Sequence, residues 1–230
     1  MPRISEIAIC ICSLSDRPEL SSKTYPALTA YAQKWGYDLH LASHTLDATR
    51  HIAWSKILLL QRLLPLYDIC VWFDDDILIT NSAAPLEGFI TENFRHGKTA
   101  FMVSADVLPQ TPMNTGVVFV RNLEQAHQRL QLIWNMCDTI GKRQEACWEQ
   151  DAFNALWLYI DNSWVDVLPY RQTQSFVRDR NLACELLWRP GDFAAHVTGM
   201  SHERRLAIIE QLQADPERFD AAAYLQSASV

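Results

Sequence analysis

Three adjacent carboxylates, Asp74, Asp75 and Asp76, directly follow an apolar run at residues 69–73. The run is short and rich in β-branched and aromatic residues, which is typical of a strand buried in a sheet. Three acids at the end of such a strand repel one another unless a cation lies among them. In an open α/β sheet, ligands bind outside the carboxyl ends of the strands. The triplet therefore predicts a cation site, with a solvated acidic turn as the competing interpretation.

The spacing of the acids indicates which ion would bind. Asp74 and Asp76 face the same way along an extended backbone, so both can reach one ion. Hard oxygen ligands in small number favour Mn²⁺ or Mg²⁺, ions that proteins usually share with the phosphates of a substrate. The net charge is −7, and no run of Lys and Arg offers a footprint for a phosphate backbone. We therefore expect Mn²⁺ or Mg²⁺ as cofactor and no nucleic-acid partner.

The first 76 residues predict an alternation of strands and helices. The expected elements are a strand at 7–12, a helix from Ser21 or Ser22 to Trp35, a strand at 37–42, a helix at 53–64 and a strand at 69–73. Gly36 is a natural helix stop. Continuous apolar runs like the first indicate strands buried on both faces of a parallel sheet. The order is the βαβαβ pattern of nucleotide-binding α/β proteins.

The rest of the chain continues this pattern in a single domain. The expected elements are a helix at 85–94, strands at 100–105 and 117–120, helices at 123–140 and 149–159, a strand at 164–168, an extended segment at 193–197 and a helix at 202–212 capped by Ser201. From Ala221 onward we expect a frayed tail of small residues. A length of 230 residues suits one sizeable α/β domain. We assign residues 1–215 to that domain and 216–230 to a C-terminal tail.

Several common sites are absent from the sequence. The chain has seven glycines and contains neither GxGxxG nor GxxxxGK[ST], so any phosphates must be held by other means, such as a metal ion. The six cysteines lack a CxxC pair, and we interpret them as free buried thiols, with Cys10 and Cys12 on one strand face. The N-terminal apolar stretch is too short for a signal sequence or a membrane span, so we expect a cytoplasmic protein without a transmembrane segment.

Five motifs, in order along the chain, carry a resemblance. They are Trp54-Ser55-Lys56, the segment 72–81 around the acids, the segment 114–122, Glu149-Gln150-Asp151 and the segment 196–199. Over residues 6 to 210 the chain resembles the galactosyl/xylosyl/mannosyltransferase family of yeast Golgi α-glycosyltransferases and plant xyloglucan xylosyltransferases. It is similar, more loosely, to glycogenin-like and lipopolysaccharide galactosyltransferases.

The resemblance implies a GT-A fold: one Rossmann-like α/β domain whose mostly parallel central sheet is flanked by helices. It also implies a metal-dependent glycosyltransferase with a DxD motif, which moves a hexose or pentose from a nucleotide-diphosphate sugar to an acceptor hydroxyl with retention of configuration. A UDP-sugar is favoured over GDP-mannose. The acceptor is a carbohydrate or another hydroxyl compound, and the sequence leaves its identity and the oligomeric state open.

The resemblance also assigns roles to residues. Asp74, Asp76 and His196 would bind the metal, although a histidine in an apolar run is by itself more often a core residue. Lys56 would be a cation beside the donor, with a surface lysine as an equal alternative. The residues matched to donor binding are Ser13, Lys56, Asp75, Asn114, Thr115, Gly116 and Gly199. Taken alone, the segment 114–116 is also compatible with a simple turn.

The catalytic assignment rests on Glu149, Gln150 and Asp151. By resemblance this segment lies across the anomeric carbon from the leaving group, and which of the three faces that carbon stays open. The helix macrodipole alone would also favour carboxylates at this position. Front-face attack by the acceptor is the expected mechanism, and a covalent intermediate on Glu149 or Asp151 is the less favoured variant.

The cation that would screen the departing diphosphate is not settled by the sequence. Relatives often have a basic residue soon after the His-x-x-Gly segment, where this chain has Ser201 and His202. His202 itself, or Arg204 or Arg205 one turn later, could therefore take its place. Arg17 and Arg50 are weaker candidates.

Trp148 and Trp188 flank the motifs and could stack on a sugar, but core packing is the favoured interpretation of each.

Two other classes of function are compatible with the sequence. A non-catalytic nucleotide-sugar-binding protein is the main alternative function. A metal-dependent phosphohydrolase is less favoured, because those enzymes place the acid pair after their first strand and here it follows the third.

Overall fold

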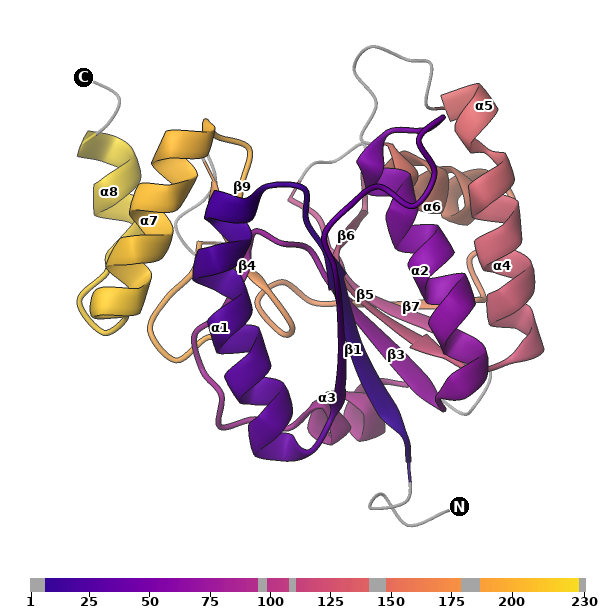
Figure 1. The fold of residues 1–230 in the computed structure, drawn as a ribbon, viewed down its shortest axis with the longest axis horizontal. Helices are drawn as coiled ribbons and strands as arrows, with labels where there is room; N and C mark the ends of the chain where they lie inside the picture. The colour runs from indigo at the N-terminus through magenta and orange to yellow at the C-terminus, as the bar shows by residue number, and fades with distance from the viewer. Residues whose placement is uncertain (1–6, 95–98, 108–110, 141–147, 179–186, 228–230) are drawn as a thin grey trace.

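The computed structural model describes residues 7–94, 99–107, 111–140, 148–178 and 187–227 (Figure 1). Its centre is a six-stranded sheet in the order β2-β1-β3-β6-β5-β7. The strands are β1 Ile9–Leu14, β2 Asp38–Ala42, β3 Ile69–Phe73, β5 Phe101–Ala105, β6 Met113–Arg121 and β7 Val165–Leu168. Strand β6 pairs antiparallel with both neighbours, and the other pairs are parallel. The sheet is therefore mostly parallel, as predicted.

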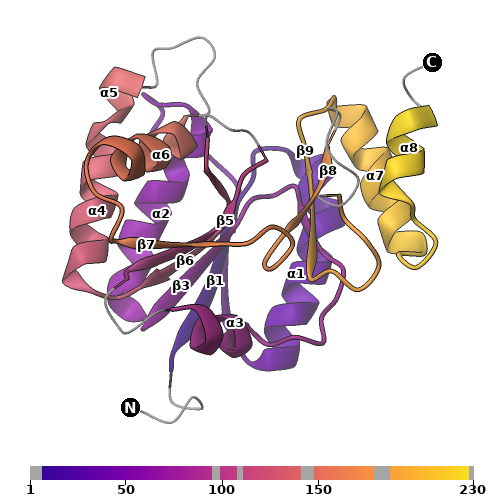
Figure 2. The ribbon, with the colours of Figure 1, turned by 180° about the vertical axis from the view of Figure 1, so that it is seen from behind.

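Helices cover both faces of this sheet (Figures 1 and 2). On one face lie α2 Ser55–Leu63, α4 Glu124–Asn135, α5 Cys137–Ile140 and α6 Glu149–Tyr159, and on the other lie α1 Pro18–Trp35 and α3 Leu86–Asn93. Two short 3₁₀ turns, η2 Ile52–Trp54 and η3 Leu64–Leu66, flank α2. Each face has its own apolar core between sheet and helices. The predicted α/β architecture is confirmed.

Strand β1 shows why the sheet is buried on both faces. All six of its residues are buried. Cys10 and Cys12 pack toward α2, whereas Ile9 and Ile11 pack toward α1. Burying each isoleucine contributes about 1.5–3 kcal/mol, which favours the fully apolar strand. Cys10, Cys12, Cys70 and Cys137 are free and buried, as expected; Cys147 and Cys184 lie outside the described residues.

A second, three-stranded sheet was not predicted. It has the order β4-β9-β8, with β4 Ile77–Ile79, β8 Ser175–Arg178 and β9 Ala194–Thr198. Strand β4 has only three residues and directly follows the acidic triplet, so its sequence shows no alternation of its own. Its pairing with β9 sets Ile77 opposite His196. This small sheet therefore brings a distant histidine to the end of β3.

The C-terminal segment differs from the expected frayed tail. Helix α7, His202–Ala214, is followed by α8, Ala221–Ser227. Phe219 and Ala221 are buried in a third apolar core with residues of α1, α7 and the small sheet. The ring centroids of Phe219 and Trp188 lie 5.9 Å apart. Tertiary packing on these side chains holds a helix that local composition did not predict.

Three further boundaries differ from the prediction. Helix α1 begins at Pro18, because proline suits the first helical position. The helix expected at 123–140 is divided at Met136 into α4 and α5. Strand β6 begins at Met113, so the segment 114–116 lies inside a strand and is not a turn before it. Among the helices of the described residues, none combines the length and the hydropathy that a membrane span needs.

Candidate active site

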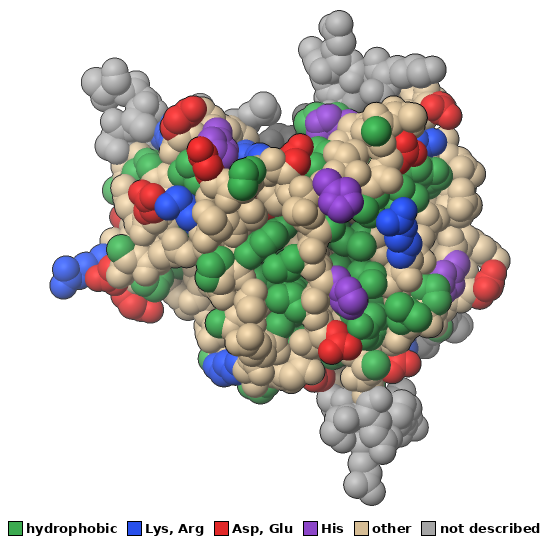
Figure 3. Space-filling view, viewed as in Figure 1, with side chains coloured by type: hydrophobic (Ala, Val, Ile, Leu, Met, Phe, Trp, Pro, Cys, Tyr) green, Lys and Arg blue, Asp and Glu red, His purple; other side chains and the backbone are tan. Residues whose placement is uncertain are grey.

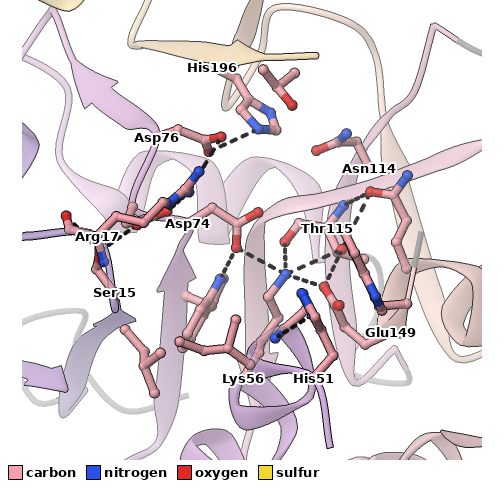
Figure 4. A pocket seen from close by; sticks show the side chains of 18 of the residues that line it. Ser15, Arg17, His51, Lys56, Asp74, Asp76, Asn114, Thr115, Glu149 and His196 are labelled. Atoms are coloured by element: carbon pink, nitrogen blue, oxygen red, sulfur yellow. Dashed lines mark hydrogen bonds and ion pairs between the residues drawn. The ribbon is translucent and has the colours of Figure 1, made fainter. Parts of the chain in front are cut away.

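A cavity of about 500 Å³ opens where the first, third and fifth strands end (Figure 4). Its lining comes from the ends of β1 and β3 and the residues that follow β1, β3 and β5, from η2 and the start of α2, from the starts of β6 and α6, and from β9 and α7. The volume is typical of a small-molecule site. Its position, outside the carboxyl ends of parallel strands, is the one that the sequence predicted for a ligand.

Asp74, Asp76 and His196 meet in this cavity. The Ile77 amide donates to the Asp74 carbonyl at 3.1 Å, which turns the chain from β3 into β4. The Val197 amide donates to the Asp76 carbonyl at 3.0 Å, which ties the turn to β9. One ligand atom from each of the three side chains lies within 4.8 Å of the others. The structure thus brings together the three residues predicted to bind metal.

This donor set fits a divalent cation. Two carboxylates and an imidazole suit Mn²⁺ or Mg²⁺. His196 Nε2 lies 3.3 Å from Asp76 Oδ1, and both side chains are buried, whereas Asp74 is partly open to the cavity. Burial alone would raise the pKa of Asp76, but His196, Arg205 and Arg17 lower it to about 2. Asp76 is therefore ionised at neutral pH, the state that metal binding requires.

The ring of His196 lies against the backbone of Gly116. A Cβ at Gly116 would lie 2.6 Å from His196 Cε1 and 2.7 Å from Gln174 Oε1, so only glycine fits. Gln174 in turn donates through Nε2 to Asn114 Oδ1 at 2.8 Å. Gly116 therefore acts through its lack of a side chain. Gln174 belongs to the same hydrogen-bonded group, although no sequence signal pointed to it.

Lys56 is buried beside the metal-ligand candidate Asp74 and is not a surface residue. Its side chain is 3% exposed, and Nζ lies 2.6 Å from Glu149 Oε1 and 3.0 Å from Asp74 Oδ1. Nζ also donates to the Thr115 carbonyl at 2.8 Å. Burial lowers the pKa of Lys56, but the two carboxylates raise it by more, so the ammonium stays charged. The surface-lysine alternative is wrong.

Gln150 is joined to Asn114 through a carboxylate that the sequence analysis missed. Gln150 Nε2 and Asn114 Nδ2 both donate to Asp106 Oδ2, at 3.1 and 3.0 Å. Gln150 Oε1 accepts from the Thr115 amide at 3.0 Å. That amide is available because the β5–β6 register shifts after Val103. Asp106 directly follows the predicted strand at 100–105. This position at the carboxyl end of a strand is the sequence signal that could have identified it as a site residue.

Asp75 lines the same cavity but is not part of the group formed by Asp74, Asp76 and His196. It accepts from Ser15 Oγ at 2.5 Å and from Arg17 Nε at 3.0 Å, and Arg17 Nη2 pairs with its other oxygen. Burial raises the pKa of Asp75, while Arg17 opposes that shift. Asp75 therefore fixes Arg17, which also lies 4.0 Å from Asp76. Ser15 was not predicted.

Arg205 is the basic residue of α7 that reaches the cavity. Its Nε lies 3.6 Å from Asp76 Oδ2 and donates to the Val197 carbonyl at 2.7 Å. His202 instead contacts Glu19 at 3.1 Å on the surface. Arg204 lies over the ring of Tyr224, away from the cavity lining. Of the three candidates that the sequence left open, Arg205 is therefore the one that lines the described cavity.

Some predicted residues are not among those that line the described cavity: Gly116, which lies against His196, and also Ser13, Asp151, Gly199 and the weaker candidate Arg50. Ser13 is buried in β1, where its Oγ donates to Tyr25 Oη at 3.2 Å. Asp151 lies one position beyond Gln150 in α6, and Gly199, at φ 71°, follows the lining residue Thr198. Arg50 donates to the Trp134 carbonyl at 2.6 Å.

Two aromatic residues lie at the rim of the cavity. Trp148 stacks on His51, with ring centroids 4.1 Å apart and planes 2° apart, and both residues line the cavity. Burial lowers the pKa of His51, while Asp16 raises it by less. Trp148 is 41% exposed, so its predicted core role is wrong, whereas Trp188 is buried as expected.

One face of the molecule is mixed in charge. On the face shown in Figure 3, basic side chains lie scattered and acidic side chains lie among them. This distribution differs from the continuous basic footprint of proteins that bind a phosphate backbone.

Comparison with solved structures identifies the fold. A glycosyltransferase involved in glycosylation of the major capsid of PBCV-1 matches with a TM-score of 0.69 at 19% identity, over 88% of this chain and 99% of that one. GlyE of Streptococcus pneumoniae TIGR4 matches at 0.59 and 11% identity, over 96% of this chain and 62% of that one. The galactosyltransferase LgtC, solved with donor and acceptor sugar analogs, matches at 0.57 and 10% identity, over 90% and 94%.

These similar structures are GT-A glycosyltransferases, so the chain has a GT-A fold, as predicted. No protein-family model matches the sequence, and no curated protein matches it. The particular yeast and plant family therefore stays a prediction.

Proposed function

We propose that this chain is a metal-dependent glycosyltransferase that moves a sugar from a nucleotide-diphosphate sugar to an acceptor hydroxyl. The observation that carries the proposal is the placement of two clusters in one cavity. Asp74, Asp76 and His196 form a metal-ligand set. Beside them, Asp106 joins the amides of Asn114 and Gln150. The first cluster suits a diphosphate with its metal, and the second suits sugar hydroxyls.

Asp74, Asp76 and His196 would hold Mn²⁺ or Mg²⁺. When bound, such an ion supplies Lewis-acid stabilisation of the negative charge that develops on a departing diphosphate. Arg205 and Arg17 lie beside Asp76, at 3.6 and 4.0 Å, and add positive charge at the same end of the cavity. Charges fixed in place before the reaction favour the transition state over the bound donor.

The amide and carboxylate cluster would orient the donor sugar. Asp106, Asn114 and Gln150 all line the cavity, and each of the two amides keeps a fixed position through the shared carboxylate. Asp106 is buried, with 3% of its surface exposed, so its hydrogen bonds lie in a medium that strengthens them. Such a fixed array of donors and acceptors suits a polyhydroxylated ring.

Retention by front-face attack is the mechanism that these contacts favour. Glu149 Oε1 accepts from Lys56 at 2.6 Å and from Thr115 Oγ1 at 3.2 Å, so this oxygen is already engaged by two donors. Asp151 is not among the described lining residues. Gln150 is therefore the residue of the three that we place against the sugar, and its amide is no nucleophile. A covalent intermediate is the less supported variant.

A UDP-sugar is the donor we favour, as the motifs implied, over GDP-mannose. The test is release of nucleoside diphosphate from UDP-glucose, UDP-galactose, UDP-xylose and GDP-mannose, each with Mn²⁺ and with a chelator. We expect Mn²⁺-dependent release from at least one UDP-sugar, and loss of release in Asp76→Asn. Metal-independent release, or none from any donor, would contradict catalysis and favour the non-catalytic binding protein.

A further inference from the structure

The stacked pair of His51 and Trp148 has no part in the functions assigned above. The rings are 4.1 Å apart and within 2° of parallel. His51 is fixed by the Ala53 amide, which donates to its Nδ1 at 3.3 Å. The two residues come from distant parts of the chain, one before η2 and one before α6. The stacked pair forms an aromatic platform on the cavity wall.

Trp148 does not serve the core. Its exposed fraction is 41%, whereas Trp54 and Trp164 are 1% and 0% exposed. Its backbone has φ 47° and ψ −119°, a conformation that bulky residues rarely adopt. A large apolar side chain that is both exposed and held in a strained backbone is commonly found at a functional site. The fold therefore holds the indole of Trp148 exposed to solvent at the rim of the cavity.

The platform lies next to the end of the cavity that suits a sugar. Trp148 directly precedes Glu149 and Gln150, and Gln150 is hydrogen-bonded to Asp106 deeper in the cavity. An acceptor must enter from solvent while the donor occupies the interior. A half-exposed aromatic face at the rim is therefore placed for the group that enters second.

We propose that Trp148, backed by His51, is the acceptor subsite and that the acceptor presents a pyranose ring. This inference rests on the proposed function. A pyranose has an apolar face of C–H groups that packs on an aromatic ring, while its hydroxyls remain at the edge in water or reach polar groups. His51 stacks on one face of the indole and keeps its plane fixed, which reduces the conformational entropy lost on binding.

The test is saturation-transfer NMR with the full chain, UDP and Mg²⁺, using methyl pyranosides of glucose, galactose, mannose and xylose. We expect transfer to the ring C–H protons of at least one pyranoside. Trp148→Ala should weaken its binding about tenfold, as loss of an aromatic contact does, and Trp148→Phe should retain most of it. Tyr159→Ala is the matched control, because Tyr159, the last residue of α6, is an 80% exposed aromatic outside the cavity lining.

A second measurement separates acceptor from donor. The thermal midpoint with UDP and Mg²⁺ should rise equally in wild type and Trp148→Ala. A loss of that rise in Trp148→Ala would assign the platform to the nucleobase and overturn the proposal. Unchanged pyranoside binding in Trp148→Ala, or no pyranoside binding to wild type, would also overturn it. A wild type that binds pyranosides without any UDP-dependent rise would instead contradict the proposed function and leave a carbohydrate platform.

Discussion

The ammonium nitrogen of Lys56 lies 2.6 Å from Oε1 of Glu149, where the start of α2 meets the start of α6 inside the protein. The same nitrogen lies 3.0 Å from Oδ1 of Asp74, at the end of β3. Lys56 therefore joins the metal-ligand set to the segment that we place against the sugar. Burial raises the pKa of Glu149 and Lys56 opposes that shift, so the ammonium favours the charged form of this carboxylate beside the acidic triplet.

Removal of this cation should destabilise the fold. Lys56→Met leaves Glu149 buried without its partner, and breaking a buried ion pair costs about 3–5 kcal/mol. Lys56→Met/Glu149→Gln should recover most of that loss, because no unpaired charge remains. Urea unfolding of the two single variants, the double variant and wild type, with chelator present, measures the coupling. Losses that simply add would show that the two residues do not depend on each other.

A methyl group at Gly116 should disturb the metal site. Gly116→Ala places a Cβ 2.6 Å from His196 Cε1, so the imidazole must move. We expect weaker Mn²⁺ binding by calorimetry and a loss of about 1–3 kcal/mol in unfolding free energy from overpacking. Gly88→Ala is the control: it lies within α3 with nothing within 4 Å of the added Cβ. That change should stabilise by about 0.5–1 kcal/mol, and equal effects from both would refute the steric argument.

Arg205 and His202 should differ sharply in catalysis. Arg205→Ala removes a fixed positive charge beside Asp76 and should lower kcat for donor hydrolysis about 100-fold. His202→Ala removes only a surface contact to Glu19 and should leave kcat near wild type. Arg205→Lys should restore part of the rate. Equal rates in the two alanine variants would exclude Arg205 as the screening cation.

The stack on Trp148 should appear in the titration of His51. Burial lowers the pKa of His51 below its ordinary value of 6.5. Trp148→Ala exposes one face of the imidazole, so the charged form becomes easier to hydrate and the pKa should rise toward the ordinary value. NMR titration of the imidazole protons, assigned with His51→Ala, measures it. A pKa that stays the same or falls would mean that the indole does not shield His51.

The central part of the fold could be predicted because its signals are local. The strand before Asp74 and the first strand are continuous apolar runs, and the helices between them have clear periodicity. Strand β4 could not be predicted, because three residues carry no pattern and its partner β9 lies more than 100 residues away. Helix α8 depends on burial of Phe219 and Ala221 against distant residues, which composition does not reveal.

The candidate site divides in the same way. Asp74 and Asp76 stand out by their spacing directly after an apolar strand, whereas His196 could be assigned only through the resemblance to a family. Asp106 and Gln174 were missed because single polar residues near strand ends are common and their partners are set by tertiary structure. For Lys56 the alternatives could be separated only by its burial beside Glu149 and Asp74.

The most direct measurement is the thermal midpoint with UDP, in Mn²⁺ and in chelator, for wild type, Asp74→Asn and Asp76→Asn. A ligand at 100 times its Kd adds about 2.7 kcal/mol to the native state, which corresponds to a rise of about 5–10 °C for a chain of this length. We predict such a rise for wild type with Mn²⁺ only, and its loss in both variants without loss of the fold. A rise that persists in chelator or in both variants would contradict a metal-dependent donor site at Asp74 and Asp76.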